Sequence, residues 1–229
     1  IKLKPDFALA HYNLGNTLHE KERISEAITH YKTFIKLKPD YAPAHYNLGN
    51  ALFAERKNEE AISNFKMAIK LKPDYAPAHY NLGNALLAIR ETEEAISYYR
   101  MAIELKPDYA PAHNNLGDAL SAERKTEEAI SHYKIAIKLK PDYAPTYNNL
   151  GGALLDERQT EEAISNFKMA IKLKPDFAVA HYNLGNVLLE KERISEAITH
   201  YKTAIKLKPD STEARHNLKI ALLRLEELE

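Results

Sequence analysis

Residues 42–75 read APAHYNLGNALFAERKNEEAISNFKMAIKLKPDY, and close copies of this stretch recur along the chain in steps of 34 residues. All eleven prolines follow the same step, seven near the end of successive copies and four near the start. They are Pro5, Pro39, Pro73, Pro107, Pro141, Pro175 and Pro209, and Pro43, Pro77, Pro111 and Pro145. A fixed period of this length is typical of stacked repeat proteins, whose working part is a surface of the stack.

Each copy contains two stretches with helical periodicity. Pro43 suits the first position of a helix, which we expect to run from about there to about Glu55. A second helix should follow Asn58, which we expect to cap it, and should end before Pro73. The same capping place holds Thr92, Thr126 and Thr160, and it shifts to Ser25 and Ser195 in the first and last copies. The pattern predicts helix–turn–helix repeats.

One glycine per copy lies inside the first helix, where glycine costs about 1 kcal/mol relative to alanine. Its recurrence within the chain indicates that two helices approach closely there, with alanines of the second helix as the expected facing residues. The glycines are Gly15, Gly49, Gly83, Gly117, Gly151 and Gly185, and the alanines are Ala27, Ala61, Ala95, Ala129, Ala163 and Ala197.

This combination of residues resembles the tetratricopeptide repeat (TPR). In residues 42–75 the matching positions are Leu48-Gly49, Ala61, Phe65, Ala68 and Pro73. Two positions depart from the family pattern. Its usual tryptophan is replaced by His11, His45, His79, His113, Tyr147 and His181, and its usual glycine between the helices by Glu22, Arg56, Arg90, Arg124, Arg158 and Glu192.

The resemblance implies an all-α, right-handed superhelical solenoid. Six repeats are expected at residues 8–41, 42–75, 76–109, 110–143, 144–177 and 178–211. Residues 1–7 match the tail of a repeat and are assigned to a remnant of a preceding one, and residues 212–229 to a capping helix with a polar outer face. Because the chain opens in mid-repeat, we expect it to be a piece of a longer protein.

Composition narrows the function. The chain has 32 basic and 32 acidic residues and no cysteine, so disulfides and thiolate metal sites are excluded. No apolar run has the length of a membrane span and no signal peptide is visible, so a cytoplasmic location is expected. No phosphate loop, nucleophile elbow or paired-carboxylate motif is present, and we expect neither an enzyme nor a cofactor.

In TPR proteins the first helices line the concave face, which implies a groove that binds a protein or peptide. One asparagine is invariant there: Asn13, Asn47, Asn81, Asn115, Asn149 and Asn183, with Asn217 in the cap. An amide offers both a donor and an acceptor, so a row of amides could hold an extended peptide by its backbone. This resembles the asparagine ladder of O-linked N-acetylglucosamine transferases. The alternative is that these amides bond between neighbouring first helices.

Further groove residues are expected on the same helix faces. The second polar row comprises Asn16, Asn50, Asn84, Asp118 and Asn186, and the apolar contacts are assigned to Tyr12, Tyr46, Tyr80, Tyr182 and Phe53. The known carboxylate-clamp mode of the family needs Lys or Arg beside the asparagines, and tyrosine and proline stand there instead.

Other interpretations explain the sequence less well. Histidines that recur every 34 residues are too far apart to share a metal ion, and the lysine pairs that end the second helices are explained by the helix dipole without nucleic acid. Three alternatives to a peptide-binding module stay open. They are a substrate-targeting piece of a larger glycosyltransferase-like enzyme, a scaffold that self-associates through its terminal repeats, and a designed array.

Overall fold

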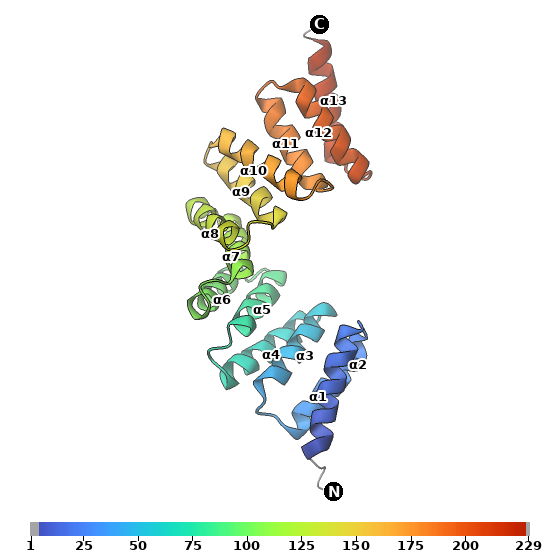
Figure 1. Cartoon of the computed structure of the whole chain (residues 1–229), viewed down its shortest axis with the longest axis vertical. Helices are drawn as coiled ribbons and strands as arrows, with labels where there is room; N and C mark the ends of the chain where they lie inside the picture. The colour runs from blue at the N-terminus through green and yellow to red at the C-terminus, as the bar shows by residue number, and fades with distance from the viewer. Residues whose placement is uncertain (1–4, 228–229) are drawn as a thin grey trace. The chain divides into compact units, whose positions relative to one another are not determined.

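The computed structural model describes residues 5–227, which form thirteen α-helices and no strand (Figure 1). The helices are α1 (Pro5–Glu20), α2 (Ile24–Leu37), α3 (Ala42–Ala54), α4 (Asn58–Leu71), α5 (Ala76–Ala88), α6 (Thr92–Leu105), α7 (Ala110–Ala122), α8 (Thr126–Leu139), α9 (Ala144–Asp156), α10 (Thr160–Leu173), α11 (Ala178–Glu190), α12 (Ile194–Leu207) and α13 (Thr212–Glu226). The predicted all-α helix–turn–helix repeat is therefore confirmed.

The chain divides into two compact units, Ile1–Ala119 and Leu120–Glu229. In the first unit, α2 packs against both α1 and α3, and α4 against both α3 and α5. In the second unit, α10 packs against α9 and α11, and α12 against α11 and α13. Each second helix thus lies between its own first helix and the next one, so the core of each unit is continuous from hairpin to hairpin.

The boundaries of the helices agree closely with the 34-residue windows, with one difference at the start. Residues 5–7, expected to be the tail of a preceding repeat, belong to the first turn of α1, while residues 1–4 lie outside the described part of the chain. From residue 42 onward, each proposed repeat window contains one complete pair of helices, α3 with α4 through α11 with α12.

The recurring glycine of the first helix is required by an aromatic ring. A β-carbon built at Gly49 would lie 2.6 Å from Phe65 Cε1, and one at Gly83 would lie 2.6 Å from Tyr99 Cε1. Such distances are far inside van der Waals contact, so alanine would force the ring or the helices apart. The close approach was predicted, but the nearest group across the interface is this buried ring rather than the alanine four residues before it.

The turn between the paired helices contains one residue with positive φ, in the left-handed region, although that residue is arginine or glutamate and not glycine. Arg56 has φ of 60°, and the equivalent glutamates and arginines of the other repeats all lie between 57° and 68°. Arg56 N–H donates to Phe53 O at 2.9 Å, and Lys57 N–H donates to Leu52 O at 2.9 Å. This pair of bonds forms a Schellman motif, which holds a residue in a conformation that glycine adopts more easily.

The predicted caps of the second helices are wrong by one residue in the middle repeats and by two at Ser25 and Ser195. Helix α4 already begins at Asn58, and its N-cap is Lys57, which makes no side-chain capping bond. Thr92, Thr126 and Thr160 are likewise the first residues of their helices, and Arg23 and Arg193 precede the helices that contain Ser25 and Ser195. The Schellman turn runs directly into the second helix, so it fixes the start that a capping side chain was expected to fix.

The histidine in the usual tryptophan place joins adjacent repeats. His45 is buried and its Nε2 lies 2.7 Å from Pro39 O, the carbonyl that ends the preceding repeat. His79, His113 and His181 make the same contact at 2.8–3.1 Å, and Tyr147 donates its hydroxyl to Pro141 O at 3.0 Å. A buried polar group with a fixed partner is consistent with packing, which is how the sequence interpreted these residues.

Helix α13 differs from the other first helices at the glycine position, which holds Lys219. Its N-cap Ser211 accepts a hydrogen bond from Ala214 N–H at 3.3 Å. Leu222 and Leu223 are 39 % and 50 % exposed, whereas Leu52, in the place of Leu222, is fully buried. Helix α13 therefore lacks the glycine that packs on an aromatic ring at Gly15, Gly49, Gly83, Gly151 and Gly185.

Candidate functional site

The invariant asparagine of the first helix uses its amide nitrogen to bind the preceding repeat. Asn47 Nδ2 donates to Tyr12 Oη at 3.1 Å and to Asn16 Oδ1 at 2.9 Å. The same pair of bonds recurs from Asn81 to Tyr46 and Asn50, from Asn115 to Tyr80 and Asn84, and from Asn217 to Tyr182 and Asn186, at 2.7–3.3 Å. Asn183 donates to Asn148 Oδ1 at 3.0 Å, because asparagine stands there in place of tyrosine.

The sequence left open whether the asparagine row binds a ligand or a neighbouring repeat. These bonds show that the amide nitrogens of this row bind the neighbouring repeat. In Asn47, Asn81, Asn115 and Asn217 both N–H groups are used between neighbouring first helices, so none of these four can offer a donor and an acceptor to one peptide bond. The form of the ladder in which each amide pairs with a whole peptide group is not confirmed by these bonds. Asn13 is exposed, and Asn149 also has an interaction partner.

The second asparagine of the helix is held from two sides through its oxygen. Asn16 Oδ1 accepts from Asn47 and from the buried Tyr31 hydroxyl, the latter at 2.9 Å. Asn84 and Asn186 accept equivalent bonds from Tyr99 and Tyr201 at 2.8 and 2.9 Å. Burial raises the pKa of both Tyr31 and Tyr201 to about 12, so both hydroxyls remain protonated donors at neutral pH.

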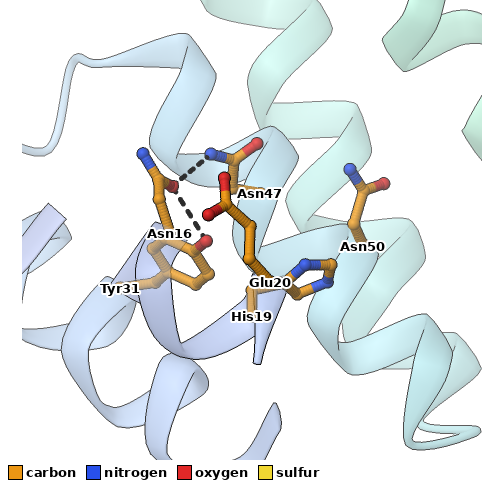
Figure 2. A pocket seen from close by; sticks show the side chains of 6 residues that line it. All are labelled: Asn16, His19, Glu20, Tyr31, Asn47 and Asn50. Atoms are coloured by element: carbon orange, nitrogen blue, oxygen red, sulfur yellow. Dashed lines mark hydrogen bonds between the residues drawn. The ribbon is translucent and has the colours of Figure 1, made fainter. Parts of the chain in front are cut away.

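Two groups of this network remain directed at the surface of the second repeat. Asn47 Oδ1 lies on the far side of its amide from Asn16, and Asn50 lies one helical turn further along α3 (Figure 2). Within residues 5–227, no hydrogen bond reaches Asn47 Oδ1 and none leaves Asn50 Nδ2. In the third repeat the equivalent groups meet each other, as Asn84 Nδ2 donates to Asn81 Oδ1 at a long 3.4 Å.

These residues line a hollow of about 270 Å³ in the first unit (Figure 2). Its lining consists of Asn16, His19, Glu20, Tyr31, Asn47 and Asn50. Helices α1, α2 and α3 all contribute, and the carboxylate of Glu20 is exposed at the surface. The hollow therefore combines amide donors and acceptors with one negative charge.

The groove stripe, defined as the places of Tyr12, Asn13, Asn16, His19 and Glu20 in each of the six repeats, carries acidic charge only. Glu20 and Asp118 lie on it in the first unit, and Asp156 and Glu190 in the second. Lysine and arginine are absent from these places in the sequence. The stripe thus lacks the cations that a carboxylate clamp requires.

The tyrosines assigned to apolar contacts have structural partners as well. Tyr12, Tyr46, Tyr80 and Tyr182 are half-buried, and each hydroxyl accepts from the asparagine of the next repeat. The ring of Tyr46 contacts that of Tyr75, with the centres 5.0 Å apart and the planes inclined at 51°, and Tyr75 is a residue that the sequence analysis did not assign. Phe53 is half-buried. The recurrence of tyrosine two residues after Pro39, Pro73, Pro107 and Pro141 was the signal that could have identified this second ring.

The lysines that end the second helices contact these rings. Lys72 Nζ lies 5.1 Å from the centre of the Tyr75 ring, and Lys106, Lys140 and Lys174 take equivalent positions at 5.0–5.5 Å. Each such cation–π contact stabilises by about 0.5–1 kcal/mol at an exposed site. Among the described residues, no group of three or more His, Asp or Glu side chains could hold a metal ion. No helix between residues 5 and 227 is long and apolar enough to cross a bilayer.

Comparison with known families and structures gives a consistent assignment. Models described as TPR repeat match residues 15–55, 49–89, 125–157 and 153–192, and models described as tetratricopeptide repeat match residues 76–109, 178–211 and 98–131. Each of these models describes the repeat itself. No curated protein matches the sequence significantly.

Solved structures with the same fold cover most of the chain. MamA is 28% identical with a TM-score of 0.66, and the match covers 70% of this chain and 94% of that one. YrrB, described as a TPR protein with an unusual peptide-binding site, is 24% identical with a TM-score of 0.69 and coverages of 82% and 97%. The Cut9–Hcn1 structure from the APC/C gives 23% identity and a TM-score of 0.80, and the match covers 94% of this chain but only 42% of that one.

Proposed function

Because the chain belongs to the tetratricopeptide repeat family, whose members are generally protein-interaction modules, we propose that its first helices bind an extended polypeptide segment. The observation that carries this proposal is the hollow on α1 and α3, where Asn47 Oδ1 and Asn50 Nδ2 are directed at the surface with no partner among the described residues. Polar groups held in place in this way are prepared to bind without further ordering.

The peptide backbone is bound by two asparagines rather than by one. Asn47 Oδ1 accepts from a peptide N–H, and Asn50 Nδ2 donates to a peptide C=O. Residues three apart on a helix are neighbours on one face, so a single extended strand reaches both. In this form Asn47 has two functions, since its nitrogen holds the preceding repeat and its oxygen binds the ligand. In the third repeat Asn84 Nδ2 already donates to Asn81 Oδ1, and in the fourth Asp118 has no N–H to donate, so the two-asparagine contact is proposed for Asn47 and Asn50.

Charge and apolar surface define the ligand further. The acidic groove stripe favours a neutral or basic segment over an acidic one, and Phe53 and the half-buried tyrosines supply apolar contact. Each hydrogen bond contributes about 0.5–1.5 kcal/mol net. A few such bonds with modest apolar burial, less the cost of ordering the ligand, give an affinity of about micromolar.

The variant Asn50→Asp tests the donor without disturbing the repeat interface. Aspartate keeps an oxygen that accepts from Asn81 Nδ2 but has no N–H to offer a peptide. The chain itself carries Asp118 in this place in the fourth repeat, so the fold accommodates the change. Fluorescence polarisation with labelled, proline-containing 12-residue peptides of zero net charge should show about five-fold weaker binding, the equivalent of one hydrogen bond of about 1 kcal/mol.

A matched control separates the lost donor from the added charge. Asn58→Asp makes the same chemical change at the first residue of α4, away from the groove stripe, and should leave binding unchanged. If Asn50→Asp binds the neutral peptides as tightly as the wild type while its circular dichroism is unaltered, the asparagine contacts are wrong. If no peptide of neutral, basic or acidic composition binds the wild-type chain, the proposed function itself is wrong.

A further inference from the structure

From α3 to α11, the residue that precedes each first helix is aromatic, whereas the one before α13 is not. Tyrosine or phenylalanine precedes α3, α5, α7, α9 and α11, whereas Ser211 precedes α13. The aromatic residues are Tyr41, Tyr75, Tyr109, Tyr143 and Phe177. The last repeat is therefore followed by a serine at the position where the other repeats are followed by an aromatic side chain.

Two kinds of contact define the place of this ring in the other repeats. The ring centre of Tyr75 lies 5.0 Å from that of Tyr46 in the preceding first helix, and Tyr109 lies at the same distance from Tyr80, with the ring planes inclined at 51° and 53°. A lysine of the preceding second helix, such as Lys72, covers the ring at 5.1 Å. Both tyrosine and phenylalanine take this lysine contact, since Lys174 lies 5.5 Å from Phe177. The place thus selects a flat ring and does not depend on a hydroxyl.

The partners of the ring are still present in the last repeat. Tyr182 stands in the place of Tyr46, and Lys208 in the place of Lys72. The first repeat fills part of the adjoining space with Phe34, which packs against Tyr12 at 5.1 Å and Tyr41 at 5.4 Å, but the last repeat has Ala204 there. Alanine also stands in this place in the second to fifth repeats, so the last repeat differs from them by Ser211, and space is left between α11, α12 and the start of α13.

The result is a pocket of about 290 Å³ in the second unit. Ala178, Val179 and Ala204 form its apolar walls, Tyr182 and Lys208 are the two ring partners, and Ser211 lies where the ring would be attached. Glu213 also lines the pocket, and its carboxylate accepts hydrogen bonds from Ser211 and Thr212 hydroxyls at 3.5 and 3.3 Å. Val179 is 48 % exposed, so the pocket is open to a ligand.

We propose that this pocket binds an aromatic side chain, tyrosine or phenylalanine, of a partner polypeptide. The ligand ring takes the place of the missing Tyr75 equivalent, lying against Tyr182 with the Lys208 ammonium over its face. The contact between the two rings stabilises the ligand beyond the burial of apolar surface, and the cation–π contact with Lys208 adds to it. The site is separate from the asparagine contacts of the first unit and stands without them.

The test uses the full chain and two small probes. p-Cresol reproduces the tyrosine side chain, and 4-methylcyclohexanol is its saturated counterpart. We expect p-cresol to shift the methyl resonances of Ala178, Val179 and Ala204 saturably in ¹³C-methyl NMR spectra, and 4-methylcyclohexanol to bind at least five-fold more weakly. The ratio measures the contribution of the aromatic face, because the two probes have similar size and apolar surface.

Two variants fill the pocket from within. Ser211→Tyr restores the ring found before the other first helices, and Ala204→Phe restores the ring of the first repeat. Each should weaken p-cresol binding at least ten-fold. Ser211→Ala is the matched control, since it removes the N-cap bond to Ala214 but leaves the pocket empty, and should bind p-cresol as the wild type does.

Three outcomes would overturn the proposal. They are the absence of saturable shifts at Ala178, Val179 and Ala204, equal binding of the saturated probe, and retention of p-cresol binding by Ala204→Phe. The last measurement stands even if Ser211→Tyr does not fold. Asn50→Asp lies in the other unit and should bind p-cresol unchanged, so failure of the peptide proposal and failure of this one can be told apart.

Discussion

Residues 10–40 and 180–210 are almost the same helical hairpin placed at two positions in the chain. They differ at three positions only, Thr17/Val187, His19/Leu189 and Phe34/Ala204. The contacts made by their shared residues recur. His11 and His181 contact His30 and His200 through their Nδ1 atoms at 2.7 and 3.0 Å, and both hairpins have an arginine–glutamate ion pair at 2.7 Å, Arg23–Glu26 and Arg193–Glu196. Local geometry is thus a property of the hairpin sequence.

Burial, in contrast, depends on the neighbours. Leu14 is 45 % exposed, whereas its equivalent Leu184 is fully buried, because α10 packs against α11 and no described helix takes that place beside α1. Two identical leucines therefore contribute differently to stability. In a stacked repeat protein the energy of a core residue belongs to the interface between repeats as much as to the repeat itself.

The largest expected effect is the difference between Leu184→Ala and Leu14→Ala. Deleting a fully buried leucine should lower the free energy of unfolding by about 2–5 kcal/mol, through lost burial and the cavity left behind. The same deletion at the half-exposed Leu14 should cost less than about 1 kcal/mol. Urea denaturation followed by circular dichroism measures both. Equal losses would show that the exposed face of α1 is covered in solution.

The glycine–ring contact provides the next comparison. A β-carbon at Gly185 would lie 2.7 Å from Tyr201 Cε1, so we expect Gly185→Ala to destabilise by about 1–2 kcal/mol, because overpacking exceeds the gain in helix propensity. A β-carbon at Gly15 would also lie 2.7 Å from Tyr31 Cε1. Gly15→Ala should nevertheless lower the free energy of unfolding by less, since among the described helices α1 has a neighbour on one side only.

Gly152→Ala is the control for this pair. Gly152 lies in helix α9, with nothing within 4 Å of a β-carbon built there, so the substitution should stabilise by about 1 kcal/mol. The readout is the urea midpoint of each variant. A stabilising effect of Gly185→Ala would mean that the ring moves aside at little cost and that steric contact is not the reason for the glycine.

The repeat fold was predictable because its signals are local and repeated. Proline spacing, the glycine and the apolar periodicity each predicted the same helix pair, and errors in one copy were corrected by the others. The starts of the second helices were missed by one or two residues, since capping side chains were expected where backbone bonds of the Schellman turn, as at Arg56 and Lys57, fix the boundary. Propensity alone does not reveal this arrangement because it places non-glycine residues at positive φ.

The candidate site was predictable in composition but not in bonding. The sequence identified Asn47 and Asn50 as groove residues and left open whether they bind a ligand or a neighbouring repeat. That choice depends on the distance from Asn47 to Tyr12, which are 35 positions apart and are brought together only by the stacking of α1 on α3. The pocket at Ser211 went unpredicted for a related reason, as it results from two small residues, Ala204 and Ser211, that lie in different elements.

A smaller effect is expected from pH in the C-terminal hairpin. Burial lowers the pKa of His200, and the neighbouring His181 lowers it further, whereas Glu196 acts to raise it and Lys168 to lower it. A histidine whose folded pKa is depressed takes up its proton more readily in the unfolded chain. Stability is therefore complete above the ordinary value of about 6.5 and is lost as pH falls through the lowered folded pKa.

The test replaces His200 with asparagine, which Asn64 and Asn166 show to be tolerated in this place. Between pH 7.5 and 5.5 the wild type should lose less than about 1.4 kcal/mol through this group, the equivalent of one pKa unit. Thermal unfolding at both pH values should show a smaller pH dependence for His200→Asn. A dependence of unchanged size would show that His200 does not titrate differently in the folded chain.

The smallest effect should be equal in the two hairpins. Glu22 and Glu192 both have φ of 57° in the turn between their helices, a conformation that costs a non-glycine residue about 1–3 kcal/mol. Glycine removes this strain but adds conformational entropy to the unfolded chain, so Glu22→Gly and Glu192→Gly should each stabilise by about 0.5–1 kcal/mol. The gains should match because the turn is internal to the hairpin, unlike the packing of Leu14 and Leu184.

Lys191→Gly is the control, since Lys191 precedes Glu192 with φ of −85° and has no strain for glycine to relieve. It should destabilise by about 0.5–1 kcal/mol, opposite in sign to Glu192→Gly. Urea midpoints of the three variants distinguish conformational strain from a general tolerance of the turn. If Glu192→Gly stabilises and Glu22→Gly does not, neighbouring repeats influence the energy of the turn. The conclusion that local geometry is a property of the hairpin sequence would then be wrong for this turn.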